Sequence, residues 1–287
     1  MKVKLPEKKT IRKRDIIIYI TIAIICIASI AIAFYVQFYA RINIVNLFGV
    51  NISQEFGNKS DEQKELIKSE FDKIFTNSIK NDENRNSEKK SDKEKDLVYS
   101  NYEKKETKEN NYDIDVHIPK INIESEVIDK YNKEIEDVFV TKAENVLKSQ
   151  NKNTIYTVEY VANVQDDILS VMIRSNLKEG SSAQRVIIQT YNYDLRNNKE
   201  ITLEEVLRIE QLDKPIVQNT IDNEIKAEQK KVEDLKKLGY NIYNRDTSSD
   251  IYKVENSKEF YLTNNTLYVI YAYGNNSFTS ETDIVIL

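Results

Sequence analysis

Hydrophobic and polar positions divide the chain into four parts: an uncharged stretch, a helical segment, a charged segment and a long patterned region. The stretch from Ile16 to Ala40 carries no charge, and a helix of that length crosses a ~30 Å hydrocarbon core. In 41–79, apolar residues recur at helical intervals after Ser60, which has capping-box spacing to Gln63. We therefore predict a transmembrane helix at 16–40 and a juxtamembrane helical segment at 41–79. The apolar face of that segment requires a partner: the membrane surface, another copy or the distal domain.

The charged segment, 80–96, alternates Lys, Glu, Asp, Asn and Ser and has almost no apolar residue. It cannot bury enough apolar surface to fold, so we predict a disordered tether. The tether is either a spacer between membrane and wall or an incidental insert. Folded structure is predicted for 97–287, which is long enough for a single hydrophobic core.

The region 97–287 is predicted to contain alternating strands, turns and two main helices. The first main helix covers about 125–149, and the second begins at Pro215 and ends before Gly239. A short helix opens with a capping box formed by Thr202 and Glu205. The predicted strands are 97–99, 112–118 (ended by Pro119), 155–164, 169–174, 186–195, 259–262, 267–273 and 283–287. This order predicts an α+β fold, in which an antiparallel sheet is packed on one face by the two main helices.

Basic residues are concentrated before the uncharged stretch. Residues 1–15 contain seven Lys or Arg, whereas Arg41 alone lies between Ala40 and Lys59. The positive-inside rule makes 1–15 a cytoplasmic stub and places the distal domain outside the cell membrane. The alternative is a secretory signal cleaved after Ala31-Ile32-Ala33, but the apolar run is longer than the usual ~7–15 residues and continues past that point. We therefore expect an uncleaved, single-pass anchor in the lipid bilayer.

Charge and cysteine content narrow the class further. Residues 1–15 carry a net +5, so with −5 overall the rest of the chain carries −10. This balance argues against nucleic acid as a ligand and favours a basic partner. Cys26, the single cysteine, lies in the uncharged stretch, so the distal domain has no disulfide. These features favour a bacterial envelope protein. The basic residues from Lys8 to Arg14 are explained by topology alone, with contact to anionic lipid or a cytoplasmic partner as the alternative.

Candidate catalytic side chains are scarce. His117 is the only histidine, which excludes a two-histidine metal site, and its strand position predicts an exposed or half-buried side chain. Asp166-Asp167 is predicted to lie at a hairpin tip and Glu204-Glu205 in a first helical turn. These acids and Asp194 are the candidates for carboxylate catalysis, which requires two acids in one cleft.

No phosphate-binding glycine loop or calcium loop is present. We therefore assign no catalytic, cofactor-binding or metal-binding residue and expect a non-enzymatic protein. The pairs Tyr191 with Tyr193 and Tyr271 with Tyr273 each share a strand face. They are either platforms for stacking on sugars or ordinary strand residues.

Three runs of the distal region carry a family resemblance. They are Glu179-Gly180-Ser181-Ser182-Ala183, the stretch from Thr190 to Leu195 (TYNYDL) and the stretch from Lys199 to Leu207 (KEITLEEVL). In this order they resemble the envelope module of PdaC-type peptidoglycan deacetylases and RsiV-type anti-sigma factors, over about 97–287. Ile118-Pro119 and Phe260-Tyr261-Leu262 also fit, whereas Tyr271-Ala272-Tyr273-Gly274-Asn275-Asn276 departs from the family's Tyr-rich loop.

The resemblance implies a limited function. In the deacetylases this module lies beside a catalytic domain with metal-binding histidines, which this chain lacks. In the anti-sigma factors it is an external receptor, able to bind lysozyme, behind a cytoplasmic sigma-binding segment, for which 1–15 is too short. The chain thus resembles the module alone on an anchor, binding or sensing a wall component such as peptidoglycan or an extracellular protein such as lysozyme. The alternative is a peptidoglycan-modifying enzyme that uses carboxylates. The oligomeric state is left open.

Overall fold

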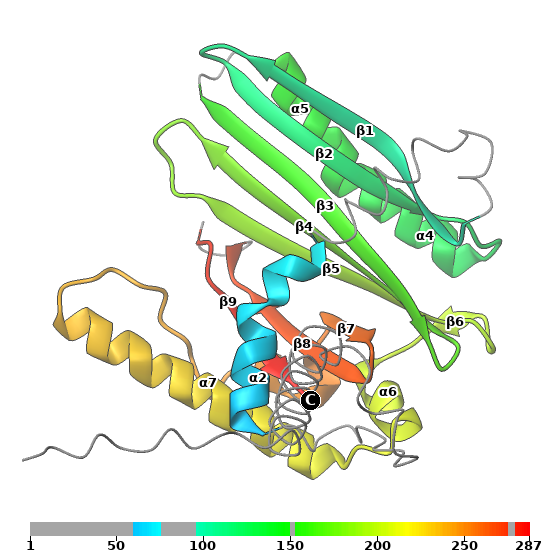
Figure 1. Ribbon diagram of the computed structural model, residues 1–287, viewed down its shortest axis with the longest axis vertical. Coiled ribbons are helices and arrows are strands. Elements are labelled where there is room, and N and C mark those ends of the chain that lie inside the picture. The colour runs from blue at the N-terminus through cyan, green and yellow to red at the C-terminus, as the bar shows by residue number, and fades with distance from the viewer. Residues whose placement is uncertain (1–59, 76–95, 150–152, 275–278) are drawn as a thin grey trace, which may run out of the picture. The chain divides into compact units, whose positions relative to one another are not determined.

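Two β-sheets form the framework of the part of the chain that the computed structural model describes, residues 60–75, 96–149, 153–274 and 279–287. The larger sheet has the order β1-β2-β3-β4-β5-β6 and the smaller one β7-β8-β9 (Figure 1). The mixed α+β class is confirmed. Ile16 to Ala40 lies outside the described residues, and within them no helix is long and apolar enough to cross a membrane. The anchor stays a prediction.

The larger sheet is mixed rather than antiparallel throughout. Its strands are β1 (Val98–Lys108), β2 (Tyr112–Ile121), β3 (Thr154–Gln165), β4 (Ile168–Glu179), β5 (Arg185–Asp194) and β6 (Lys199–Glu200). All neighbours pair antiparallel except β2 and β3, which are parallel. A parallel pair requires a crossover, and the helical segment between these strands supplies it. The expected antiparallel sheet is corrected in this respect.

Pro119 does not end β2, contrary to the prediction. The parallel ladder to β3 ends at Val116, so Pro119 has no ladder bond to donate on that side. On the other side it lies opposite Ser100, beside an irregularity in the pairing of β1 between Ser100 and Tyr102. Proline is tolerated within a strand at such places because its missing N–H is not needed there.

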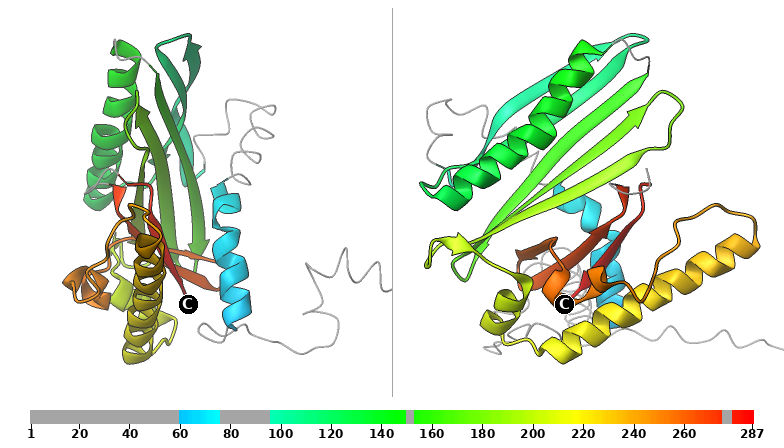
Figure 2. Two further views of the ribbon diagram at one scale, coloured as in Figure 1. Left: turned by 90° about the vertical axis from the view of Figure 1, so that its left-hand side faces the viewer. Right: turned by 180° about the vertical axis from the view of Figure 1, so that it is seen from behind.

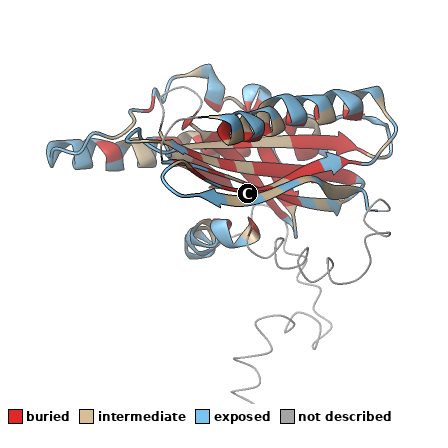
Figure 3. Cartoon of the chain, turned by 90° about the horizontal axis from the view of Figure 1, so that it is seen from above, coloured by how far each residue is buried: buried red, intermediate tan, exposed pale blue. Residues whose placement is uncertain are grey.

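The first main helix runs as predicted and covers one face of the larger sheet. It consists of α4 (Glu126–Ile135), a π-helical turn η3 (Glu136–Val140) and α5 (Thr141–Lys148), and the Ser125 side chain caps its start. Its buried residues share an apolar core with β2, β3, β4 and β5. Figure 3 shows the exposed residues of this helix on its outer side and the buried ones along the sheet.

The second main helix covers the smaller sheet instead, so the two helices do not share one face as predicted. The smaller sheet comprises β7 (Phe260–Thr263), β8 (Thr266–Ala272) and β9 (Thr282–Ile286). One of its faces packs on α6 (Leu203–Ile209), α7 (Lys214–Lys237) and the 3-10 turns η4 (Asp250–Tyr252) and η5 (Val254–Asn256).

Helix α2 (Asp61–Ser69) and the helical residues 71–75 belong to the same folded unit and cover the other face of the smaller sheet (Figure 2). Phe71 and Phe75 are buried among residues of both sheets. Lys68 on α2 donates to Glu224 and Glu228 on α7, at 2.6 and 2.9 Å. Of the three partners considered for this apolar face, the structure places the distal domain there. The capping box of Ser60 and Gln63 is also confirmed.

The packing of α2 on the distal domain bears on the predicted tether, residues 80–96. Most of 80–96 lies outside the described residues, but the chain before it and the chain after it pack into one unit. The predicted tether therefore connects two segments of the same folded unit.

Candidate functional site

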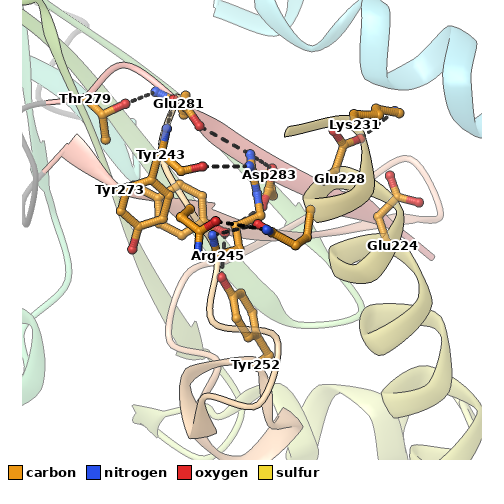
Figure 4. A network of polar contacts seen from close by, with 12 residues as sticks. Glu224, Glu228, Lys231, Tyr243, Arg245, Tyr252, Tyr273, Thr279, Glu281 and Asp283 are labelled. Carbon is orange, nitrogen blue, oxygen red and sulfur yellow. Dashed lines mark hydrogen bonds and ion pairs between the residues drawn. The ribbon is translucent and has the colours of Figure 1, made fainter. Parts of the chain in front are cut away.

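A buried ion pair lies under the edge of the smaller sheet. Arg245 lies in the loop that follows α7, and Asp283 lies on β9. Arg245 donates from Nε to Oδ2 of Asp283 at 2.6 Å and from Nη2 to Oδ1 at 2.8 Å. Their side chains are only 5% and 2% exposed. Two parallel charge-assisted hydrogen bonds hold both groups in one orientation (Figure 4).

Three tyrosines complete this network. The Tyr273 hydroxyl donates to Oδ2 of Asp283 at 2.5 Å, and the hydroxyls of Tyr252 and Tyr273 are 2.9 Å apart. The rings of Tyr243 and Tyr273 stack with centroids 4.4 Å apart. Burial, followed by the charge of Asp283 and the hydrogen bond to it, raises the pKa of Tyr273 far above its ordinary value. Tyr273 therefore stays a neutral donor at any physiological pH.

Arg245 is firmly charged in this setting. Burial opposes its charge, but the hydrogen bonds and charge of Asp283 outweigh burial and raise the pKa of Arg245. Its backbone N–H also donates to Oε1 of Gln229 on α7 at 2.8 Å. The network thus ties the loop after α7 to β8 and β9.

Glu281 connects the network to the surface. Its Oε1 accepts from the backbone N–H of Tyr243 at 2.8 Å. Its Oε2 is buried, has no hydrogen-bond donor among the described residues, and lies 3.6 Å from Nη2 of Arg245. The group thus contains one guanidinium, that of Arg245, and two carboxyl groups, those of Asp283 and Glu281.

A surface pocket of about 440 Å³ opens at Glu281, with walls from 183–184, 241–243 and 279–281. Three other hollows of the described surface are similar in volume. None of their lining residues has a buried side-chain oxygen without a hydrogen-bond partner, whereas Glu281, a lining residue of this pocket, has one in Oε2. The arrangement presents an aromatic ring beside a fixed carboxylate, which suits a cationic group.

Gly274 holds one wall of this region in place. A Cβ at this position would lie 1.9 Å from the carbonyl oxygen of Val186 on β5 and 2.9 Å from that of Thr279. Only glycine permits so close an approach of two backbones. The end of β8 is thereby fixed against the edge of the larger sheet.

The structure brings Asp166, Asp167 and Asp194 to one end of the larger sheet, where each stabilises a turn. Asp166 and Asp167 form the β3–β4 turn with φ of 51° and 60°. Asp167 pairs with Arg196, and Oδ1 of Asp194 accepts from the backbone N–H groups of Arg196 and Asn197. These contacts are those of turn residues, as the sequence predicts.

Glu204 and Glu205 lie in the first turn of α6, as predicted. Glu205 completes the capping box with Thr202, and its hydrogen bonds from Lys199 and Thr202 lower the pKa of Glu205 to about 2. His117 is half-buried on β2, with Nε2 3.4 Å from Oδ1 of Asp115. Neither position faces the pocket at Glu281.

The tyrosine pairs share strand faces as predicted, but the faces are internal. Tyr191 and Tyr193 are buried in the core under α4, and Tyr271 and Tyr273 are buried in the core under α7. Such rings offer no free surface to a sugar. Tyr243, the ring at the pocket, was missed because 240–258 shows no periodic pattern. A charged Asp283 at the start of an apolar strand was the available signal, because such a residue requires a buried partner.

The fold and the site define a mixed α+β domain with two sheets and a polar pocket at the edge of the smaller one. No family model and no curated protein matches the sequence. Among solved structures, a DUF3298 family protein from Pseudomonas aeruginosa PAO1 aligns over 66% of this chain and 87% of its own, with 12% identity and a TM-score of 0.38. A DUF3298 family member from Bacteroides fragilis NCTC 9343 aligns over 56% of this chain and 60% of its own, with 16% identity and a TM-score of 0.29.

Proposed function

We propose that the chain is a single-pass, membrane-anchored protein of the bacterial cell envelope, whose extracytoplasmic domain binds a partner without catalysing a reaction. The carboxylate of Glu281 carries this proposal, because it is fixed at a pocket with Oε2 lacking a donor among the described residues. A buried polar atom without a partner lowers stability. A partner that supplies a cationic donor removes that penalty.

The charge of the site supports a cationic ligand. A single guanidinium, that of Arg245, faces two carboxylates: it hydrogen-bonds to Asp283 and lies 3.6 Å from Oε2 of Glu281. Residues 16–287 also carry a net −10, which attracts basic partners and repels anionic ones. Two candidates supply such groups: a wall component such as peptidoglycan, through its free amines, and a basic extracellular protein such as lysozyme.

Binding fits the network better than catalysis does. General acid–base catalysis requires a group whose pKa lies near the working pH. The surroundings of Tyr273 and Arg245 instead raise the pKa of both groups away from neutrality. Asp283 accepts three hydrogen bonds from these two side chains, which leaves it no role as a nucleophile.

A carboxylate-dependent enzyme acting on peptidoglycan is the alternative, and one observation favours it. Burial, followed by the charge of Asp166 and a hydrogen bond with it, raises the pKa of Glu210 to about 7. Pairs of acids with separated pKa values serve as acid and base in hydrolases. Labelled peptidoglycan incubated with the wild-type chain and with Glu210→Gln tests this reading. Released peptidoglycan fragments with the wild type but not with Glu210→Gln support the enzyme alternative. No released fragments at high protein concentration contradict it.

The binding proposal is tested with the full chain in detergent, mixed with insoluble peptidoglycan or with lysozyme. Glu281→Gln keeps the shape of the side chain and removes its charge. We expect it to weaken binding about tenfold or more, since a hydrogen bond to a charged group contributes about 1.5–3 kcal/mol. Glu124→Gln is the matched control, because Glu124 is exposed and outside the pocket. Binding to neither partner, or equal binding by the wild type and Glu281→Gln, contradicts the proposal.

A further inference from the structure

The C-terminal end of α7 reaches away from both sheets (Figures 1 and 2). Val232 is the last buried residue of the helix. Beyond it, Leu235, Leu238 and Tyr240 are large apolar residues with 39%, 75% and 61% of their surface exposed. Three exposed apolar side chains within six residues are unusual for a helix end that faces only water.

Backbone hydrogen bonds define the turn that follows α7. The N–H of Tyr240 donates to the carbonyl of Leu235 at 3.2 Å, and that of Gly239 donates to Lys236 at 2.9 Å. Gly239 has φ of +90°. These bonds form a helix-ending motif that normally brings the residues at its two ends together. That motif joins the backbone of Tyr240 to that of Leu235, and it leaves Leu238 exposed.

The same tip is basic on an otherwise acidic body. Residues 230–240 contain four lysines and two acids, a net of +2. Residues 1–59 contain nine Lys or Arg and three Asp or Glu, a net charge of +6. Since the whole chain carries −5, residues 60–287 carry −11. An acidic body with one basic projection is repelled from an anionic surface in every orientation except the one that presents the projection.

The described chain begins at α2, which lies against α7. Helix α2 is joined to α7 by Lys68, and Lys64 lines a hollow together with Thr220 of α7. Lys64 thus lies near Thr220 and Lys68 near Glu224 and Glu228, so the start of α2 lies beside the N-terminal half of α7 and not at its tip. Residues 41–59 connect the predicted anchor to this part of the chain, and fully extended they span roughly 65 Å.

We propose that residues 230–240, the tip of α7, bind an anionic lipid surface. Leu238 and Tyr240 enter the boundary between headgroups and acyl chains, and the lysines of the tip contact lipid phosphates. Apolar side chains flanked by lysine are the chemistry of interfacial helices, because the lysine stems lie along apolar surface while their ammonium groups stay at the headgroups. This contact rests on the proposed anchoring and orients the pocket at Glu281 relative to the membrane.

The test uses the full chain with Cys26→Ser in proteoliposomes of phosphatidylglycerol or of phosphatidylcholine. An environment-sensitive fluorophore is attached at Leu238→Cys. The matched control is Ile155→Cys on β3, another exposed apolar position at 44%. We expect a blue shift and at least threefold stronger quenching by spin-labelled lipid at 238 than at 155, in phosphatidylglycerol only. Added salt and the double substitution Lys236→Gln, Lys237→Gln should reduce both signals.

Equal quenching at 238 and 155 in phosphatidylglycerol overturns the proposal, as does a signal of the same size in phosphatidylcholine. Flotation of the vesicles reports anchoring separately from the fluorescence. Partner binding through Glu281 is measured in detergent without vesicles, so the failure of one proposal is distinguishable from the failure of the other.

Discussion

The two sheets are stabilised in different ways. The larger sheet follows chain order from β1 to β6, and its core under α4 and α5 consists of apolar residues and tyrosines. The smaller sheet is covered by α2 and α7, whose contact residues Lys68 and Glu224 are 156 positions apart. It also contains the buried pair of Arg245 and Asp283. The larger sheet is thus a scaffold built from local patterns, while the smaller one depends on long-range contacts and carries the pocket.

Removing the last strand should have the largest effect. Deleting Ile284–Leu287 takes four buried apolar residues from β9 and the chain end. Each is worth roughly 1.5–3 kcal/mol when fully buried, and together they rival the ~5–15 kcal/mol stability of a typical domain. We expect fragment 60–287, which contains every described element, to unfold cooperatively and fragment 60–283 to lose that transition, as measured by thermal circular dichroism. Equal melting temperatures would show that β9 is not part of the core.

Asp283→Ala should be the most damaging single substitution. It leaves the Arg245 guanidinium buried without its counter-ion, and breaking such a pair costs about 3–5 kcal/mol. Urea unfolding at pH 7 measures the loss. Asp167→Asn is the control, since it keeps a residue that tolerates the φ of 60° in the turn and removes only the pair with the exposed Arg196, and such pairs contribute about 0–1 kcal/mol. An equal decrease in the free energy of unfolding for the two substitutions would contradict the view that the smaller sheet depends on its buried ion pair.

Phe75→Ala tests the contribution of the segment that precedes the charged stretch. Phe75 is fully buried, and the guanidinium of Arg174 lies 4.2 Å from its ring centroid. Truncating a buried phenylalanine costs about 3–5 kcal/mol, and we expect the lower part of this range because residues 71–75 lie at the edge of the core. Leu66→Ala is the control at an exposed position of the neighbouring helix α2. A melting temperature unchanged by Phe75→Ala would show that 60–75 is dispensable.

The smallest expected effect is the dependence of stability on pH. Burial raises the pKa of Glu210 and of Glu259 to about 7, from 4.5. The folded state therefore holds protons that the unfolded state releases between about pH 4.5 and 7, so the free energy of unfolding falls as pH rises through that window. For Glu210 we expect about 1 kcal/mol after solvent screening. Glu210→Gln should reduce the fall of the melting temperature between pH 5 and 8, leaving the part due to Glu259, and an unchanged slope would contradict this assignment.

Local features of the fold could be predicted from the sequence. The capping boxes at Ser60 and Thr202 and the turn at Asp166-Asp167 were predicted because neighbouring residues determine them. The same holds for the helix that begins after Ser125 and for the end of α7 at Gly239.

Long-range features could not be predicted in this way. The parallel pairing of β2 with β3 depends on a crossover, and Pro119 is tolerated only because that ladder ends before it. The division into two sheets depends on which helix covers which strands. Arg245 and Asp283 are 38 positions apart, and no spacing rule pairs two charges at that distance. The candidate pocket therefore required the tertiary structure.

The central claim is that the buried network holds the pocket in a binding conformation, and the double substitution Arg245→Met, Asp283→Leu tests it most directly. Replacing a buried ion pair by apolar residues of similar volume is often neutral or stabilising, so the domain should remain folded. Glu281 and Tyr243 would lose the guanidinium beside them. The account predicts that the variant keeps a cooperative melting transition and binds the partner that the wild type captures at least tenfold more weakly. A folded double variant that binds with wild-type affinity would contradict it.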